Sequence, residues 1–481
     1  MSSTDNKFEV FIFESICDSS DLSKLSEIVR QYDVRKIIKY VRNGRIYKKD
    51  GKKEMAAFRL QSCNSPSLSG RSPPSTLLLH IPTRCNLTCN SSFTRFKMSI
   101  SSTPQTAAIP ENHSVLGCGM AAVDFLVAVD SYPNPDDKIR STSFQVQGGG
   151  NAGNALTCAA RLGLSPRIIS KVADDSQGKA ILEELEADGV DTSFMVVSEG
   201  GHSTFSYVIV DSQAKTRTCI YTPGYPPMIP EDLSKSNLSS ALDDVRFVYF
   251  DGVLQETELL SALVVAREAH RRNIPIVIDA ESKRERVDDL LNLATYVVCS
   301  ARFPQVWTEA PSIPAALVSV LLKLPNIKFV IVTLGEDGCM MLERAEAEDL
   351  QSEEIDVDEL FKKMKQSIDT DATSATSISS DIAKLHAKGI GTVSGKLLLG
   401  TAEKIPPSEL VDTTGAGDAF IGAVLYALCA NMPPERMLPF ASQVAAIGCR
   451  ALGARAGLPQ LTDPRLKPFL VNDPQNVATL L

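Results

Sequence analysis

Short apolar runs alternate with helical stretches along the chain from Val115 onward. The runs are rich in Val, Ile and Tyr, and they predict strands at 115–119, 167–172, 205–211, 217–222, 246–252, 274–280, 294–300 and 328–335. Helices are predicted between several of these strands, at 154–163, 178–190, 258–273 and 313–324. Such an alternation is typical of a parallel sheet that helices cover. We therefore expect an α/β fold with a central, mostly parallel sheet.

Two segments depart from this alternation. FSYVIVD and RTCIYT flank the short polar turn SQAK, which predicts a hairpin that projects from the main sheet. Residues 343–390 are first acidic and then polar and low in complexity, so we expect them to bury little and to loop out without regular structure, apart from one short helix near 358–366. On this basis a short Gly-Ser linker should replace residues 350–385 without loss of folding or activity.

The chain before residue 111 has a different composition. Residues 55–110 contain five Lys or Arg, many Ser and Thr, and neither Asp nor Glu. This composition resembles an organelle transit peptide whose functional start is Met55, which predicts a plastid location. Alternatively, these residues are a linker that follows a small N-terminal module, residues 1–54, and the protein is cytoplasmic. At the other end, residues 472–481 are expected to form a short C-terminal tail.

Charge and hydropathy exclude some partners. The chain has 481 residues and a formal net charge of −9, whereas nucleic-acid binding needs a basic surface. No apolar run approaches the roughly 18 residues of a membrane-spanning helix. We therefore expect neither a nucleic-acid partner nor a membrane partner. The 11 cysteines are odd in number and scattered, which indicates reduced thiols rather than a disulfide framework.

The stretch VDTTGAGDAF, residues 411–420, carries the clearest chemistry. Small residues at 415–417 precede a predicted helix, where backbone N–H groups lack partners and attract anions. Without side chains there, a phosphate can approach closely. Asp418 would repel that phosphate unless it has another role, and the role that fits is general base for an attacking hydroxyl. The alternative is a glycine-rich helix start with Asp418 as a capping residue.

A second glycine cluster, QGGGNAGN, leads into the helix predicted at 154–163. Asn151 and Asn154 are three residues apart and can share one helix face. Their amides both donate and accept hydrogen bonds, which suits a polyhydroxylated ligand. Asp124, expected near the end of the first strand, offers another acceptor.

These pieces, in this order, resemble the PfkB (ribokinase-like) carbohydrate kinase family. The carrying motifs are Gly119 followed by Asp124, GGNAGN, and DTTGAGD, and together with the RT of RTCIYT they look most like ketohexokinase-type members. The resemblance implies a three-layer α/β/α kinase domain at 111–471, interrupted by the insert at 343–390. It also implies a small β lid, with strands within about 125–148 and 203–224.

The resemblance further implies a role for individual residues. Asp418 would be the catalytic base, beside an anion hole formed by Gly415, Ala416 and Gly417. The acceptor sugar would be held by Asp124, Gly149, Asn151, Asn154 and Arg217. The nucleotide would lie against Thr333, Gly335, Gly338, Ala445 and Cys449, although the helix that carries the last two could equally be a buried packing helix.

Metal ions are implied in the same way. Asp412 and Thr414 lie where family members bind a monovalent cation such as K⁺. The family's N-x-x-E motif, linked to magnesium, is replaced by Ser300-Ala301-Arg302-Phe303. Asp279 and Glu281 could serve Mg²⁺ instead, and the alternative is that both are solvated acids at a strand end.

The sequence therefore predicts an ATP-dependent kinase that phosphorylates a hydroxyl of a small ketohexose-like or ribose-like sugar. Its partners would be the sugar and ATP, with a homodimer formed through the lid as a further expectation. A nucleoside kinase of the same fold and a non-catalytic sugar or nucleotide sensor are alternatives. The stretch GCGMAA (117–122) fits a dinucleotide-binding fingerprint, but Pro133 and Pro135 follow where a helix is needed, so an NAD-dependent oxidoreductase is disfavoured.

Overall fold

The computed structural model describes residues 113–252, 256–345 and 354–470. The expectations for residues 1–54, 55–110 and 472–481 lie outside the described residues. Within the described part of the chain, no helix combines the length and the apolar character needed to cross a membrane.

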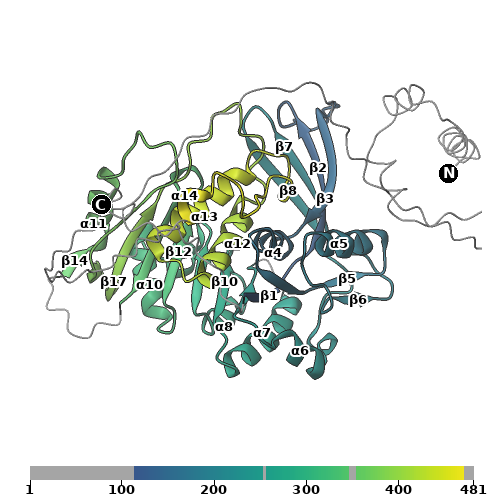
Figure 1. Ribbon diagram of the computed structural model, residues 1–481, viewed down its shortest axis with the longest axis horizontal. Coiled ribbons are helices and arrows are strands. Elements are labelled where there is room, and N and C mark those ends of the chain that lie inside the picture. Colours follow the sequence, from purple (N-terminus) through teal and green to yellow (C-terminus); the bar gives the residue numbers. More distant parts are fainter. Residues whose placement is uncertain (1–112, 253–255, 346–353, 471–481) are drawn as a thin grey trace, which may run out of the picture. The chain divides into compact units, whose positions relative to one another are not determined.

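An eleven-stranded sheet forms the centre of the fold (Figure 1). Six neighbouring strands are parallel, namely β4 (Ser165–Ile169), β1 (Ser114–Cys118), β9 (Phe247–Phe250), β10 (Ile276–Ala280), β11 (Tyr296–Cys299) and β12 (Phe329–Thr333). The sheet continues through β13 (Cys339–Arg344), β17 (Gly391–Gly400), β16 (Ala383–Ala387) and β14 (Glu354–Asp356), and β15 (Ser377–Ser379) also pairs with β17. β13 and β17 run antiparallel to their neighbours, so the sheet is mixed but mostly parallel.

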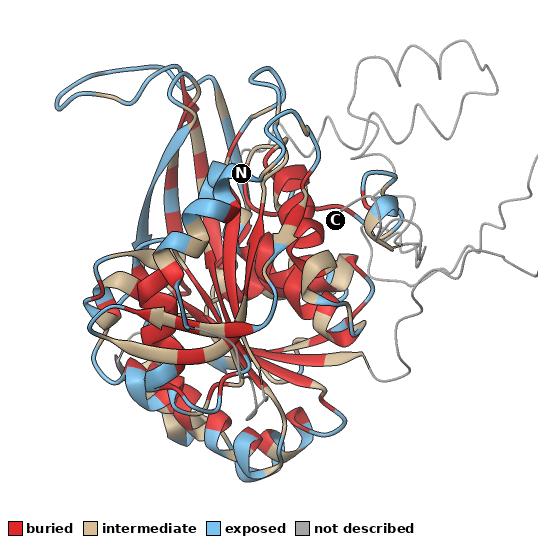
Figure 2. Ribbon diagram, turned by 90° about the vertical axis from the view of Figure 1, so that its left-hand side faces the viewer, coloured by how far each residue is buried: buried red, intermediate tan, exposed pale blue. Residues whose placement is uncertain are grey.

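Helices cover both faces of this sheet. Successive residues of a strand point to opposite faces, so each buried strand contributes side chains to the core on both sides. In β9, for example, Val248 belongs to one buried cluster and Tyr249 to the other. The Tyr249 side is covered by α4 (Asn151–Arg161), α5 (Ser176–Ala187), α12 (Ala416–Cys429), α13 (Pro434–Gly448) and α14 (Lys467–Leu470). The Val248 side is covered by α6 (Lys235–Ala241), α7 (Glu256–Arg271), α8 (Val287–Leu291), α9 (Phe303–Thr308), α10 (Ile313–Lys323) and α11 (Val357–Gln366). Figure 2 shows the buried strands between these layers. The predicted three-layer α/β/α class is confirmed.

A separate four-stranded sheet stands beside the larger one, at the upper right of Figure 1. Its order is β3 (Ser143–Gly149), β2 (Ala122–Val129), β7 (Phe205–Asp211) and β8 (Thr216–Thr222). The predicted hairpin is confirmed, since β7 and β8 pair antiparallel from Phe205–Thr222 to Asp211–Thr216. We call this sheet the lid sheet. A further short pair joins β5 (Lys171–Ala173) to β6 (Val196–Ser198).

The strand boundaries differ from the prediction at two places. Asp124 does not end the first strand but lies within β2, in the lid sheet. The chain leaves the larger sheet at Gly119, where a Cβ atom would lie 2.2 Å from the Asp251 carboxylate, and Met120 donates its backbone N–H to the same carboxylate. The strand predicted at 167–172 is likewise two strands, β4 and β5, which separate at Ser170.

The expectation that residues 343–390 loop out was wrong for the residues of this range that the structure describes, 343–345 and 354–390. Only the short helix near 358–366 is confirmed, as α11. The segment also supplies β14, β15 and β16, and it extends the larger sheet along β17. Low complexity concealed the alternation of buried Ala383, Leu385 and Ala387, which face α10 and α11 while the backbone of β16 pairs with β17. Pairing with a distant strand outweighed the weak local preference.

Candidate active site

The start of α12 forms the centre of the candidate site. Gly415 is the N-cap residue and adopts a left-handed conformation with φ of 73°, which an L side chain rarely allows. A Cβ atom on Gly417 would meet no atom within 4 Å, so the space before the first turn is open. The first N–H groups of a helix have no partner within it and carry partial positive charge. Of the residues predicted to form an anion hole, Gly417 therefore faces open space at the start of α12.

Asp418 follows this open space in the first turn of α12 and is buried. Its Oδ2 accepts a hydrogen bond of 2.8 Å from Nδ2 of Asn154. The pKa of the Asp418 carboxyl is raised to about 7, mainly by burial and also by the charges of Glu281 and Asp251, although the Asn154 hydrogen bond and Arg217 lower it. The capping alternative was wrong, because Gly415 occupies the N-cap. Asp418 is thus a buried carboxyl group whose pKa lies near neutral pH.

Asn151 and Asn154 lie at the N-terminal end of α4, as predicted, and each meets a carboxylate. Asn154 contacts Asp418, and Nδ2 of Asn151 donates to Oε1 of Glu281 at 2.8 Å. The loop after β10, which carries Glu281, and the start of α12 therefore meet at α4.

The lid sheet brings three more predicted residues to this place. A Cβ atom on Gly149 would lie 2.3 Å from the carboxyl carbon of Asp124, so the two are in contact across β2 and β3. Burial raises the pKa of Asp124 to about 6, and a hydrogen bond from Ser206 opposes the shift. From β8, Nη1 of Arg217 donates to Oγ1 of Thr413 at 3.1 Å. The lid sheet thus touches the loop that precedes the anion hole.

Four carboxylates gather at the ends of β9 and β10 and at the start of α12, namely Asp251, Asp279, Glu281 and Asp418. Asp279 is only 4% exposed, so the alternative of a solvated acid was wrong for this residue. Burial, together with the charges of Glu281 and Asp418, raises the pKa of Asp279 well above its usual range. Among the residues that the structure describes, no set of three Asp, Glu, His or Cys side chains is arranged to hold a metal ion.

Asp412 and Thr414 form a tight turn just before the anion hole. Oδ1 of Asp412 accepts from the backbone N–H of Thr414 at 2.9 Å and from its hydroxyl at 2.7 Å. Oδ2 accepts from the backbone N–H of Gly453 at 2.8 Å. These three donors stabilise the buried charge of Asp412, and the turn fixes the path of the chain into Gly415.

The residues expected to contact the nucleotide lie on two elements. Thr333 ends β12, and Gly335 and Gly338 bracket the short helix η2 (Gly335–Asp337), both with positive φ. A Cβ atom on Gly335 would meet nothing within 4 Å, whereas one on Gly338 would lie 2.1 Å from the Gly400 carbonyl oxygen. Ala445 lies on α13 and is half-buried, and Cys449 follows that helix and is buried.

Two residues at this site were not foreseen. Asp251 follows the buried strand β9, and its Oδ2 accepts from the backbone of Met120 at 2.6 Å and of Ala152 at 3.2 Å. The position of an acidic residue directly after a buried strand could have indicated Asp251 as a site residue from the sequence. Arg455 donates to Oδ1 of Asn154 at 2.9 Å, across 301 residues of chain, and no local pattern announces such a contact.

The dinucleotide alternative finds no support in this geometry. After β1 the chain passes directly into β2 of the lid sheet, and no helix follows GCGMAA. A Rossmann fingerprint needs a helix there, whose N-terminus receives the pyrophosphate.

Comparison with known proteins places the chain among sugar kinases. The sequence model of the pfkB family of carbohydrate kinases matches residues 112–370 and 384–461. The chain is 25% identical over 346 residues to ribokinase of Bacillus subtilis (strain 168), which covers 71% of this chain and 94% of that protein. It is 21% identical over 353 residues to ketohexokinase of Mus musculus, over 72% of this chain and 97% of that protein. The expected likeness to ketohexokinase-type members in particular is thus matched at higher identity by a ribokinase.

The fold agrees with these sequence matches. Arabidopsis thaliana ribokinase, solved in complex with ribose and ATP, superposes with a TM-score of 0.52 over 74% of this chain and 98% of that one, at 18% identity. This similarity shows a ribokinase-like α/β fold, with its large mixed sheet and its small separate sheet.

Proposed function

The chain belongs to the pfkB family of carbohydrate kinases, phosphotransferases with an alcohol group as acceptor, and we propose that it phosphorylates a small neutral sugar with Asp418 as general base. The observation that carries this proposal is the pairing of a buried, hydrogen-bonded Asp418 with the open space at Gly417. Asp418 can accept a proton, and the adjacent open space at Gly417 can receive a phosphate.

The reaction follows from these two features. An acceptor hydroxyl placed against Asp418 gives its proton to the carboxylate as its oxygen attacks the γ-phosphorus of ATP. The bond from that phosphorus to the β–γ bridging oxygen breaks, and ADP leaves. The backbone N–H groups at 415–417 stabilise the charge on the phosphoryl oxygens, and no covalent enzyme intermediate is needed.

The charges of the site favour a neutral acceptor. Five carboxylates surround the proposed acceptor position, and the cations that interact with them are three arginines, Arg217, Arg284 and Arg455. The carboxylates are Asp124, Asp251, Asp279, Glu281 and Asp418. A sugar acid or sugar phosphate would be repelled by this excess, because charges in a partly buried site are weakly screened. Ribose-like and ketohexose-like sugars fit, and so does the sugar of a nucleoside.

ATP and Mg²⁺ complete the proposal. Mg²⁺ binds through one or two carboxylates together with substrate phosphates and water, so a protein site with three ligands is not required. Asp279 and Glu281 fit this use, since burial raises the pKa values of both and the charge of Glu281 raises that of Asp279 as well, which a cation would relieve. When bound, Mg²⁺ offsets the charge of the polyphosphate. We propose Thr333, Gly335, Gly338, Ala445 and Cys449 as the nucleotide side of the site.

Dependence on a monovalent cation such as K⁺ is a separate proposal that rests on Asp412 and Thr414. Their turn leads directly into the anion hole, so an ion there would act on Gly415 and its neighbours. The three hydrogen bonds to Asp412 hold the turn without an ion, however. Turnover measured in K⁺ and in tetramethylammonium shows whether a bound ion contributes to activity beyond these three hydrogen bonds.

Location and assembly also remain proposals. A fluorescent reporter fused to residues 55–110 should enter plastids and lose that segment, and a diffuse, uncleaved fusion would favour the cytoplasmic linker. We propose a homodimer formed through the lid sheet, whose outer face is described below.

The central test is ADP release by the full-length protein with ATP and Mg²⁺. Ribose, fructose and nucleosides form the neutral panel, and gluconate and fructose 6-phosphate form the anionic panel. We expect turnover only with the neutral panel, and loss of turnover in Gly417→Val, whose side chain would fill the open space. Binding of ATP and sugar without ADP release would favour the sensor, and preference for a nucleoside over its free sugar would favour the nucleoside kinase.

A further inference from the structure

Arg455 lies in the loop after α13, yet its side chain ends inside the stretch QGGGNAGN, residues 147–154, which we call the acceptor turn. The residue is 2% exposed and among the largest buried side chains of the described residues. Nε donates to Oδ1 of Asn154 at 2.9 Å, and Nη2 donates to the carbonyl oxygen of Gly149 at 2.8 Å. Both partners are residues that we assign to the acceptor sugar, although Arg455 belongs to neither of their elements.

The glycines of the acceptor turn make room for this guanidinium. A Cβ atom on Gly148 would lie 2.1 Å from Nη1 of Arg455, and one on Gly153 would lie 2.4 Å from Nη2. Either contact is too close for any side chain. Two of the glycines in QGGGNAGN are therefore explained by the arginine rather than by direct approach of a ligand.

The backbone around Arg455 is held from several sides. Leu452 packs against the buried cluster of the lid sheet, and the backbone N–H of Gly453 donates to Asp412. The carbonyl oxygen of Arg455 itself accepts from Nη1 of Arg161 at 2.6 Å. The guanidinium thus enters the acceptor turn from a fixed position.

Arg455 determines which way the Asn154 amide faces. A primary amide has an oxygen that accepts and a nitrogen that donates, and the two ends can exchange by rotation. Arg455 can only donate, so it holds the oxygen, and the nitrogen is left to face Asp418. In the reversed orientation, the amide oxygen would face an acceptor-only carboxylate.

We propose that Arg455 is a positioning residue for phosphoryl transfer: by fixing the amide of Asn154, it orients the carboxylate of Asp418 toward the acceptor hydroxyl. The inference rests on the proposed function of Asp418, and it adds a residue that touches neither the acceptor hydroxyl nor the base. A purely structural role, in which Arg455 only fills the turn, is the competing explanation.

Kinetics separate these two explanations. Arg455→Met keeps the volume but removes every donor. We expect kcat to fall by about 10- to 100-fold, the usual effect of losing a hydrogen bond to a charged group, while KM for ATP is unchanged. Arg455→Lys, which can still donate to Asn154, should recover part of kcat. Should Arg455→Met not fold, the same comparison is made between Arg455→Lys and the wild type.

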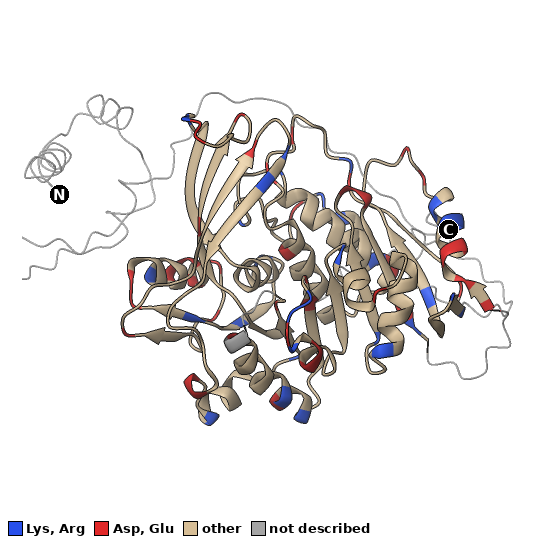
Figure 3. Ribbon diagram, turned by 180° about the vertical axis from the view of Figure 1, so that it is seen from behind, with Lys and Arg blue, Asp and Glu red and all other residues tan. Residues whose placement is uncertain are grey.

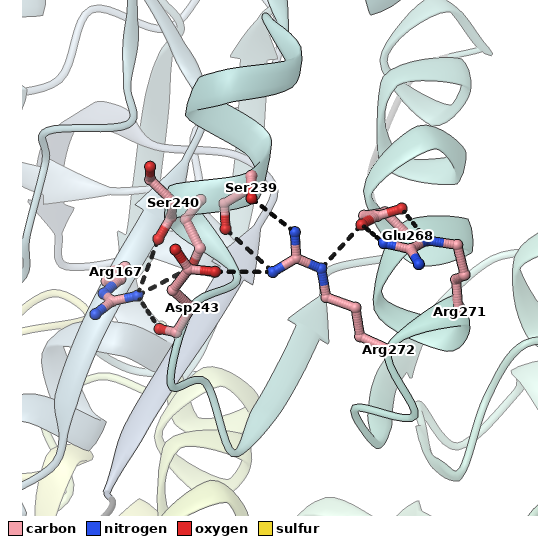
Figure 4. A network of polar contacts seen from close by, with 8 residues as sticks. Arg167, Ser239, Ser240, Asp243, Glu268, Arg271 and Arg272 are labelled. Atoms are coloured by element: carbon pink, nitrogen blue, oxygen red, sulfur yellow. Dashed lines mark hydrogen bonds and ion pairs between the residues drawn. The ribbon is translucent and has the colours of Figure 1, made fainter.

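A matched control comes from a second arginine with several contacts. Arg272 donates to Ser239, Asp243 and Glu268 between α6 and α7, in the network of Figure 4. Its contacts include none of the site residues. Arg272→Met should lower the midpoint of thermal unfolding and leave kcat and both KM values unchanged. Equal losses of kcat in the two variants would assign Arg455 to stability alone.

A double-mutant cycle tests the route through Asn154. In an Asn154→Leu background there is no amide to orient, so Arg455→Met should lower kcat by less than about threefold further. Multiplicative effects of the two substitutions would overturn the inference.

A spectroscopic readout stands apart from turnover. With ¹⁵N-labelled asparagine in the full chain, the side-chain amide protons of Asn154 should exchange slowly with solvent in the wild type. They should exchange at least tenfold faster in Arg455→Met. Unchanged exchange would overturn the positioning role. Absence of turnover in the wild type, with the exchange result intact, would instead overturn the proposed function.

Discussion

At Asp418 a buried carboxylate has Asn154 as its hydrogen-bond donor, and its charged neighbours include two acids, Asp251 and Glu281, and one cation, Arg217. A general base works best when its pKa lies near the working pH, and burial raises the pKa of Asp418 to about 7. The base is active when deprotonated, so kcat should fall about tenfold per pH unit below this value. A pH–rate profile on a confirmed acceptor measures it. A profile that is flat from pH 5 to 8 would contradict the assignment.

Asp418→Asn tests the same residue by substitution. The amide keeps the size of the carboxyl group but cannot take a proton, so kcat should fall by about 10²- to 10⁴-fold. Affinity for a nonhydrolysable ATP analogue should hold or improve, because a negative charge near the polyphosphate is removed. Calorimetry beside turnover separates the two effects. Near-full kcat in this variant would place the base elsewhere.

The buried charge at Asp418 should also make the protein less stable at neutral and higher pH. The pKa is raised in the folded state, so the folded protein holds the proton more tightly than the unfolded chain. The resulting stability is present below the unfolded value near 4 and is lost as the pH rises through about 7. Asp418→Asn should therefore melt higher than the wild type at pH 8 and about equally at pH 4. An equal difference in melting temperature between Asp418→Asn and the wild type at both pH values would show that burying the Asp418 charge costs little stability.

Single residues differ in how far the sequence could predict them. Asp418 and Asn154 were found because each lies in a short motif whose chemistry is local. Their contact, across 264 residues, was not predicted, nor was the Arg455 contact that orients it. Sequence spacing carries no information about residues that only the fold brings together.

At the scale of elements, the segment at 343–390 is the largest difference between prediction and structure. β16 lies between β14 and β17, and it buries Leu385 between the sheet and α10. Leu385→Ala should lower the free energy of unfolding by about 2–5 kcal/mol, because it leaves a cavity. Ile382, just before β16, is exposed and serves as the control, so Ile382→Ala should change stability by less than about 0.5 kcal/mol. Urea denaturation of the two variants measures whether β16 is a packed part of the sheet or a loop that buries little.

The replacement of residues 350–385 by a short linker, which the sequence predicted to be harmless, should instead destabilise the fold. Replacing residues 350–385 by a linker would remove β14, α11, β15 and most of β16, and would leave β17 unpaired along that edge. The strands of the parallel region were predictable because their Val/Ile-rich runs are buried on both faces. β14, β15 and β16 were not predictable, because they are short and largely polar, and because β15 and β16 form by pairing with β17 and β14 by pairing with β16.

At the scale of the whole molecule, the lid sheet has one buried face and one exposed face. Leu126, Val208 and Val210 pack inward. On the other face, the register aligns Val146, Phe125, Tyr207 and Ile220 in one apolar row across all four strands. Figure 3 shows few charged residues along these strands. Such an apolar row on the outer face of a sheet is typical of a protein–protein contact.

A second copy of the chain is the occupant that we propose for this face, since a two-fold axis would place the same row against itself. Val146, Tyr207 and Ile220 are 52%, 50% and 54% exposed in the single chain. Ile220→Glu should bury charge at the contact and convert a dimer to a monomer in sedimentation velocity. Val197, 49% exposed on β6 and outside the lid sheet, provides the control, and Val197→Glu should leave the dimer intact. A wild-type protein that sediments as a monomer at tens of micromolar would contradict the proposal.

If the dimer forms, Ile220→Glu should also raise KM for the acceptor, because β8 carries Arg217 to the proposed active site and the dimer contact would hold that strand in place.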